Sequence, residues 1–245
     1  GIGLATAKEL ASLGANVVLV ARNEGKLKKA IAELDTSNDQ QHSYISVDFQ
    51  YPELVKEKFE KLAAEKSSIN ILINNTGGPA GGLAVDADPS AYLAAFSQHL
   101  ICNQTIVQAL VEKMKVAEFG RIINIISTSV KQPLNGLGVS NTVRGAVANW
   151  SKTLANELGQ YNITVNNVLP GATNTVRLEA IAENKAKKTG QTVDQVYEAF
   201  AKQVPMGRIA EANEVANAVA FLASPSASYI NGINVPVDGG RTACL

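Results

Sequence analysis

Ser127, Ser140 and Arg144 are polar residues whose types and spacing could serve a bound ligand. Ser127 directly follows an apolar run at 122–126, and Ser140 and Arg144 stand one turn apart near the start of the next helix. Ligands of open parallel sheets bind outside the carboxyl ends of the strands, so two hydroxyls and a guanidinium there could hydrogen-bond a polar molecule. A strand end, a helix cap and a solvated Arg explain the same residues equally well.

The elements around these residues are readable from hydrophobic spacing. Residues 120–126 include isoleucines at 122, 123, 125 and 126, and a strand that is apolar on both faces is typical of the interior of a parallel sheet. A helix is predicted from Val139 or Ser140, because apolar residues then recur mostly three or four apart. These are Val143, Val147, Trp150, Leu154 and Leu158.

The remaining chain alternates predicted strands and helices. Further strands are expected at 16–21, 42–49, 69–74, 163–169 and 233–237. Further helices are expected at 4–11, 26–34, 52–66 and 211–223. Residues 89–114 are expected to form one long helix, and residues 176–205 to contain two short helices. This alternation predicts βαβ units and an α/β fold whose parallel sheet is flanked by helices, in a single domain over 1–245.

Composition is typical of a soluble protein and argues against several kinds of partner. Of 245 residues, 46% are hydrophobic and 18% charged, and 22 basic residues balance 22 acidic ones. Without a basic cluster we expect no nucleic-acid partner, and without a long apolar run no membrane span. We expect no signal peptide, no metal site, and a cytoplasmic location in which Cys102 and Cys244 stay free thiols.

Right-handed crossovers place the loops that follow the strands at one edge of the sheet. That edge is predicted to collect Gly1, Gly3, Arg22, Asp48, Asn75, Gly77, Ser127, Pro170 and Gly171. Gly1 and Gly3 open a helix, which suits close approach of a phosphate to backbone N–H groups, although a plain tight turn has the same sequence.

Arg22 is relevant to whether the carboxyl edge of the sheet would bind NADP or NAD. It follows the strand at 16–21, where an acidic residue would bind ribose hydroxyls and an Arg suits a 2′-phosphate. NADP is therefore favoured over NAD, unless Arg22 is an ordinary surface residue. Asp48 could accept a hydrogen bond from an adenine amino group, or it could cap the next turn.

Five motifs together resemble the short-chain dehydrogenase/reductase family, and within it the 3-oxoacyl-acyl-carrier-protein reductases. In order they are GIG, NNTGG, GRIINIIS, VNNVLPGATNT and AVAFLASPSASYINGINVPVDGG, and they span essentially the whole chain. The resemblance implies a Rossmann-type doubly wound sheet, a nicotinamide cofactor and a homo-oligomer, a tetramer or dimer. It also implies that the protein interconverts a carbonyl compound and a secondary alcohol.

The resemblance also implies roles for individual residues. Ser127 matches the catalytic Ser of the family, and Asn74 to Gly77 match its NNAG motif with Thr76 in place of Ala. The matching motifs, together with Arg22, assign the following residues to the cofactor: Gly1, Ile2, Gly3, Arg22, Asp48, Asn75, Gly77, Arg144, Pro170, Gly171 and Thr175.

Three of the four active-site positions depart from the family pattern. Ser140 stands where the family has Tyr, Arg144 where it has Lys, and His99 where it has a helix Asn. A Ser hydroxyl is a far weaker acid than a phenol with a pKa of about 10, whereas Arg144 keeps a positive charge for ribose hydroxyls. His99 should titrate near neutrality. One hypothesis is therefore that His99 supplies or relays a proton to a carbonyl oriented by Ser127; an interior His without such a role is the alternative.

Two functional classes follow: an NADP-dependent oxidoreductase with an altered proton donor, and a nucleotide-binding or scaffold protein of the same fold.

The family's first strand would lie between the strands at 16–21 and 69–74. Its loss would leave unpaired backbone groups at a cost of about 1–3 kcal/mol each. We therefore expect a fragment of a longer chain, lacking about a dozen or more residues at its start, that could fail to bind a nucleotide. Residues 176–206 would be a mobile lid or a solvated helix pair.

Overall fold

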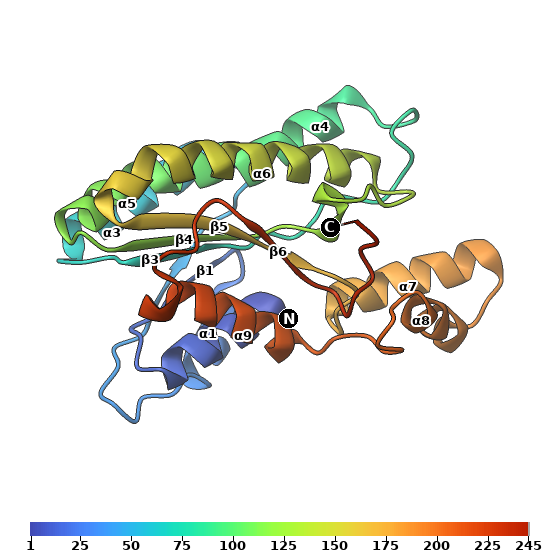
Figure 1. Ribbon diagram of the computed structural model, residues 1–245, viewed down its shortest axis with the longest axis horizontal. Coiled ribbons are helices and arrows are strands. Elements are labelled where there is room, and N and C mark those ends of the chain that lie inside the picture. Colours follow the sequence, from blue (N-terminus) through green and yellow to red (C-terminus); the bar gives the residue numbers. More distant parts are fainter. Residues whose placement is uncertain (245) are drawn as a thin grey trace.

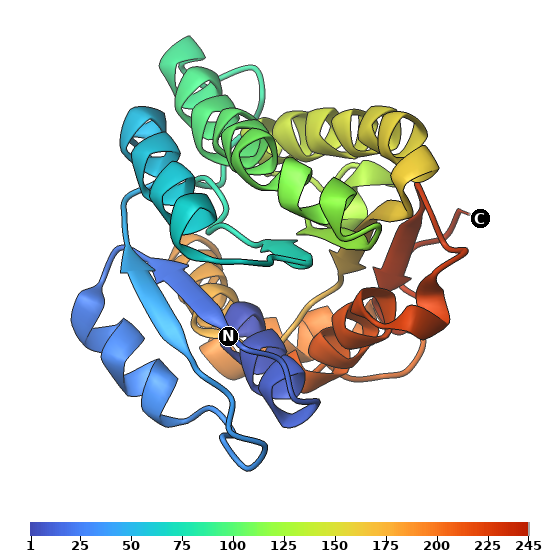
Figure 2. The ribbon, with the colours of Figure 1, turned by 90° about the vertical axis from the view of Figure 1, so that its left-hand side faces the viewer.

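The computed structural model describes residues 1–244, and its strands form two parallel sheets. β1 (Val18–Ala21) pairs with β2 (Ser43–Ser46). The larger sheet has the order β3-β4-β5-β6, with β3 (Ile71–Asn74), β4 (Gly120–Ile125), β5 (Ile163–Pro170) and β6 (Asn234–Val237). Among the described residues no strand pairing joins β1 to β3, which is the place expected for the family's first strand, and Figure 2 shows the two sheets apart.

Helices cover both faces of the larger sheet, as the predicted doubly wound α/β fold requires. In chain order the α-helices of the described residues are α1 (Ile2–Ser12), α2 (Glu24–Ala32), α3 (Pro52–Glu65), α4 (Pro89–Phe96), α5 (Cys102–Val116), α6 (Gly138–Leu158), α7 (Val176–Thr189), α8 (Val193–Lys202) and α9 (Ala212–Ala223). Figure 1 shows α3, α5 and α6 on one face and α1 and α9 on the other. The predicted pair α7 and α8 follows the end of β5 and lies beside the sheet (Figure 1). Within residues 1–244, no helix combines the length and apolar character needed to cross a lipid bilayer.

β4 is buried at all six of its positions, as its isoleucines predicted. Successive side chains of a strand point to opposite faces. Ile122 accordingly belongs to the apolar cluster formed with α3 and α5, whereas Ile123 and Ile125 pack in the cluster that includes Val215 and Val219 of α9. This double burial fixes the carboxyl end of β4, after which Ser127 follows.

The run predicted as one helix over 89–114 contains a π-helical turn at Ser97–Ile101, between α4 and α5. The N–H of Cys102 donates to the carbonyl of Ser97, five residues back. The prediction of an uninterrupted α-helix is therefore wrong at this point. A π turn carries one extra residue, and hydrophobic spacing alone does not reveal it. The turn contains His99, whose side chain is buried.

Four Asn side chains form a hydrogen-bonded row across the larger sheet, one on each strand in matching register. Asn74 Nδ2 donates to Asn124 Oδ1 at 2.8 Å, Asn124 Nδ2 to Asn167 Oδ1 at 3.1 Å, and Asn167 Nδ2 to Asn234 Oδ1 at 2.8 Å. Ser151 of α6 joins the row, accepting from Asn124 and donating to Asn167, both at 2.8 Å. Buried amides need such partners, so the row ties α6 to the strands in one register.

Candidate active site

Ser127 lies two residues beyond β4, at the carboxyl edge of the sheet. Its Oγ accepts a hydrogen bond from the Ser129 N–H at 3.1 Å, which holds the oxygen in place and leaves the hydroxyl proton available for a ligand. A cavity of about 220 Å³ lies beyond the next residue, Thr128, and Ser127 itself does not line it. The lining residues include no acidic side chain: they are Thr128, Gln132, Leu134, Gln203, Arg241 and Thr242.

The guanidinium of Arg144 is buried at the same edge, 7% exposed, where α6 directs it toward the ends of two strands. Nη1 donates to the Ile125 carbonyl at 3.2 Å, and Nη2 donates to the Thr76 carbonyl at 3.4 Å. Burial, and after it the positive charge of Arg177, lowers the pKa of Arg144 to about 10. Arg144 therefore keeps its charge at neutral pH. Ser140, one turn earlier on α6, is half-buried.

His99 lies beneath the loop that follows β3. Its Nδ1 is 3.0 Å from Thr76 Oγ1, its side chain is 1% exposed, and its Nε2 has no hydrogen-bond partner within residues 1–244. Burial, and secondly the charge of Arg144, lower the pKa of His99 to about 3, although a backbone hydrogen bond with Gly77 opposes them. The expectation that His99 titrates near neutrality is therefore wrong, because the buried site disfavours the imidazolium.

The first turn of α1 contacts two other loops of the edge. A Cβ at Gly3 would lie 2.6 Å from Asn75 Nδ2, so a larger residue there would displace the Asn75 side chain, and a Cβ at Gly1 would lie 3.6 Å from Thr175 Cγ2. Thr175 Oγ1 in turn caps α7 by accepting from the Leu178 N–H at 3.3 Å. The first N–H groups of a helix lack intrahelical acceptors, so the start of α1 at Ile2 can receive an anion.

Arg22 and Asp48 lie at the ends of the paired strands β1 and β2. The Arg22 Nη1 is 3.7 Å from Asp48 Oδ2, and the two side chains are 69% and 31% exposed. Asp48 also accepts from the Gln50 N–H at 2.9 Å, so it does cap the following turn. The pair is open to a ligand.

The turn after β5 is packed against the C-terminal segment. The Gly171 N–H donates to the Val237 carbonyl at 2.9 Å, and a Cβ at Gly171 would lie 2.8 Å from the Cα of Asp238. Pro170 is the last residue of β5 and directs the chain into this turn. The close approach to the backbone of Asp238 therefore requires glycine at position 171.

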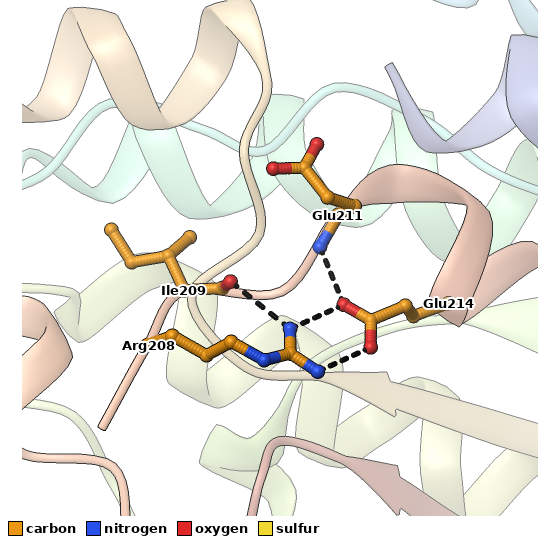
Figure 3. A network of polar contacts seen from close by, with 4 residues as sticks. All are labelled: Arg208, Ile209, Glu211 and Glu214. Carbon is orange, nitrogen blue, oxygen red and sulfur yellow. Dashed lines mark hydrogen bonds and ion pairs between the residues drawn. The ribbon is translucent and has the colours of Figure 1, made fainter. Parts of the chain in front are cut away.

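Arg208, Glu211 and Glu214 form a charged network that also binds Asn174, in the loop that follows β5. Figure 3 shows the fork of Arg208, whose Nη1 and Nη2 bind the Glu214 carboxylate at 2.7 and 2.6 Å. Glu214 also accepts from the Glu211 N–H at 2.8 Å, and the Glu211 carboxylate accepts from Asn174 Nδ2 at 3.2 Å. The Arg208 hydrogen bonds are the main cause of a lowered Glu214 pKa, about 2. The loop before α7 is thereby held to the start of α9.

The structure joins the predicted site residues into three groups. Gly1 and Gly3 contact Thr175 and Asn75, His99 joins Arg144 through Thr76, and Arg22 pairs with Asp48. The sequence analysis did not single out Arg177, whose Nη2 donates to the Pro79 carbonyl at 2.7 Å. The one signal in the sequence that could have pointed to Arg177 is its position two residues after Thr175, which was predicted to contact the cofactor.

Comparison with known proteins identifies the family. A family described as enoyl-(acyl carrier protein) reductase matches residues 1–242. The chain is also 30% identical over 241 residues to the NADPH-dependent reductase BacG of Bacillus subtilis, covering 98% of this chain and 93% of BacG. The chain belongs to the short-chain dehydrogenase/reductase family. The resemblance inferred from the five motifs is confirmed.

Other short-chain dehydrogenases/reductases show the same breadth of similarity. The 3-oxoacyl-[acyl-carrier-protein] reductase FabG of Pseudomonas aeruginosa is 31% identical over 242 residues, covering 98% of this chain and 92% of FabG. The crystal structure of L-sorbose reductase from Gluconobacter frateurii, complexed with NADPH and L-sorbose, superposes with a TM-score of 0.93 at 30% identity. That match covers 100% of this chain and 94% of the reductase, and it confirms the Rossmann-type fold.

Proposed function

We propose that this protein is an NADPH-dependent reductase of a ketone, which also catalyses the reverse oxidation of the secondary alcohol. The supporting observation is that the start of α1, Asn75 and Thr175 meet at the carboxyl edge, where Asn75 Nδ2 lies 2.6 Å from the place of a Cβ at Gly3. Relatives over nearly the full chain bear the names of NADPH-dependent and 3-oxoacyl reductases. A 3-oxoacyl compound is therefore the first substrate to test.

The residues at this edge fit an NADP cofactor. The helix start at Gly1 to Gly3 suits the diphosphate, and Arg22 suits the 2′-phosphate that distinguishes NADP from NAD. Asp48 is assigned to the adenine and Arg144 to the nicotinamide ribose. The nicotinamide end is assigned to Asn75, Gly77, Pro170, Gly171 and Thr175. When bound, the reduced cofactor supplies the hydride.

The chain's own residues handle the carbonyl oxygen in this proposal. The Ser127 hydroxyl donates to the oxygen, and the buried charge of Arg144 stabilises the negative charge that develops there. The proton then reaches the oxygen through Ser140 or a water molecule. Because His99 is neutral at physiological pH, it does not act as a cationic acid, and a proton relay through it would require a water molecule or a substrate group at Nε2, which has no partner within residues 1–244.

Cofactor titration followed by substrate turnover tests the proposal. We expect NADPH to bind more tightly than NADH, measured by its fluorescence. Arg22→Ala should weaken NADPH binding by about tenfold or more while leaving NADH binding nearly unchanged, because one charge-assisted contact is lost. Lys26→Ala, which removes a positive charge from α2, is the matched control. Equal loss for both nucleotides would contradict the assignment of Arg22.

Turnover separates a reductase from a nucleotide-binding scaffold. We expect NADPH oxidation with acetoacetyl thioesters or with small ketones, and a loss of about a hundredfold in kcat for Ser127→Ala with unchanged NADPH affinity. NADPH binding without turnover of any ketone would favour the scaffold. A homo-oligomeric state and a cytoplasmic location stay predictions.

A further inference from the structure

Two guanidinium groups from distant parts of the chain converge on Gly78. A Cβ at Gly78 would lie 3.7 Å from Arg177 Nη2 and 3.9 Å from Arg144 Nη2. Arg144 comes from α6, and Arg177 is the second residue of α7. Each is oriented by a main-chain carbonyl of the same loop, Arg144 by Thr76 and Arg177 by Pro79. The loop after β3 therefore holds both cations at one place.

The two positive charges have no acidic partner within residues 1–244. Both donate to main-chain carbonyls and neither forms an ion pair with a carboxylate. The charge of Arg177 disfavours the charged form of Arg144, and no carboxylate compensates for it. Arg144 is buried whereas Arg177 is exposed, so an anion that reached both from the solvent side would neutralise the buried charge at little cost in desolvation.

A main-chain donor adds to the site. In the described part of the chain, the N–H of Gly78, the residue on which both guanidiniums converge, donates to no acceptor. Together with the unused N–H groups of the two guanidiniums, it offers donors suited to the oxygens of a carboxylate or a phosphate. An uncharged or cationic ligand group would leave these donors unsatisfied.

The position of this set favours a substrate over the cofactor as the source of the anion. The same loop continues to Gly82, whose N–H donates to the Gly136 carbonyl at 2.8 Å and whose carbonyl accepts from the Gly138 N–H at 3.0 Å. Residues 136–138 belong to the segment that joins Ser127 to Ser140, where the carbonyl is proposed to bind. The start of α1, at Gly1 to Gly3, offers a separate place for a diphosphate.

We propose that Arg144, Arg177 and the Gly78 N–H bind an oxyanion of the substrate, so that the substrate is a ketone bearing a carboxylate or a phosphate. This inference rests on the proposed reductase function, because it assigns the substrate class of that site. Arg177 is the specificity residue here, whereas Arg144, already assigned to the nicotinamide ribose and to the carbonyl oxygen, adds its charge to the site.

Two pairs of ketones test the proposal: acetoacetate against its methyl ester, and dihydroxyacetone phosphate against dihydroxyacetone. The melting temperature of the full chain is measured with each compound, with and without NADP⁺. One or both oxyanions should stabilise the wild type, and their neutral partners should not. Arg177→Gln should weaken binding of the oxyanion by about tenfold or more, as expected when a charge-assisted contact is lost, and Arg177→Lys by less. Lys188→Gln, which removes an exposed positive charge from the far end of α7, should have no effect.

The outcomes separate this inference from the function on which it rests. The proposal is overturned if neither oxyanion stabilises the wild type, or if Arg177→Gln binds it as the wild type does. It is also overturned if Arg177→Gln weakens NADPH binding and leaves oxyanion binding unchanged, because the cations would then serve the cofactor diphosphate. Stabilisation that depends on Arg177, without turnover of any ketone, would support the oxyanion site and reject the reductase.

Discussion

His99 and Thr76 are two residues at which the chain departs from the family motifs, and they contact each other. The Thr76 hydroxyl lies 3.0 Å from His99 Nδ1, and the carbonyl of Thr76 accepts from Arg144. Thr76, His99 and Arg144, which all differ from the family pattern, are therefore in contact with one another through Thr76. A buried neutral imidazole that contacts a hydroxyl is consistent with a structural role and with a proton relay, and these differ in their response to pH.

The first prediction concerns the stability that His99 contributes. In the unfolded chain His99 takes up a proton near its usual pKa of 6.5, whereas the folded protein keeps it neutral down to about pH 3. Acid therefore favours the unfolded state between these values, and stability rises with pH across the same window. Between pH 7 and pH 5 the wild type should lose about 2 kcal/mol more than His99→Asn. Urea unfolding at both pH values measures this difference, and parallel losses would contradict it.

The second prediction concerns the missing phenol. Ser140 is half-buried and lies one turn before Arg144 on α6, at the position of the family's Tyr. A phenol is a much stronger acid than a Ser hydroxyl, and the adjacent guanidinium would favour its ionised form. Ser140→Tyr should therefore raise kcat for a ketone by about tenfold or more, within the usual range of general acid catalysis. Ser140→Phe has the same ring without the hydroxyl, and an equal gain in that variant would exclude proton donation as the cause.

At the scale of single elements, the sequence was sufficient for β4 and insufficient for the helix that contains His99. The isoleucines at 122, 123 and 125 predicted a strand buried on both faces, because apolar character alone decides burial there. The π turn at Ser97–Ile101 is defined by backbone hydrogen bonding, such as that from Cys102 to Ser97, which leaves hydrophobic spacing nearly unchanged. Likewise, nothing in the spacing predicted that Arg177 lies beside Arg144, because the fold alone brings α6 and α7 together at Gly78.

The third prediction concerns the Asn row of the larger sheet. Asn124 contacts Asn74, Asn167 and Ser151, all of them buried. Asn124→Leu keeps a similar volume but leaves these partners without hydrogen bonds, so it should lower the free energy of unfolding by about 3 kcal/mol or more. Ile123→Val, at the adjacent fully buried position, should cost only about 1 kcal/mol. Urea denaturation compares them, and a smaller loss for Asn124→Leu would show that the row adds little stability.

At the scale of the whole molecule, the residues proposed to bind the cofactor come from both sheets, and the strands of the two sheets differ in burial. β4 is buried throughout and β5 at all but its last position, whereas the strands of the smaller sheet are partly exposed along their length. Arg22 and Asp48 belong to the smaller sheet, and Ser127 and Arg144 to the larger one. The parallel direction of the strand pairs was predictable from the alternation of strands and helices along the chain.

The last prediction follows from this division. Local stability depends on buried apolar contacts, and β4 is buried at every position whereas β1 and β2 are partly exposed along their length. Amide protons of Val18–Ala21 and Ser43–Ser46 should therefore exchange with solvent about tenfold or more faster than those of β4. A cofactor that contacts Arg22 and Arg144 together would link the sheets, so NADPH should slow exchange in β1 and β2 more than in β4. Hydrogen exchange measured with and without NADPH tests both statements, and equal protection of the two sheets without ligand would show that they already unfold as one unit.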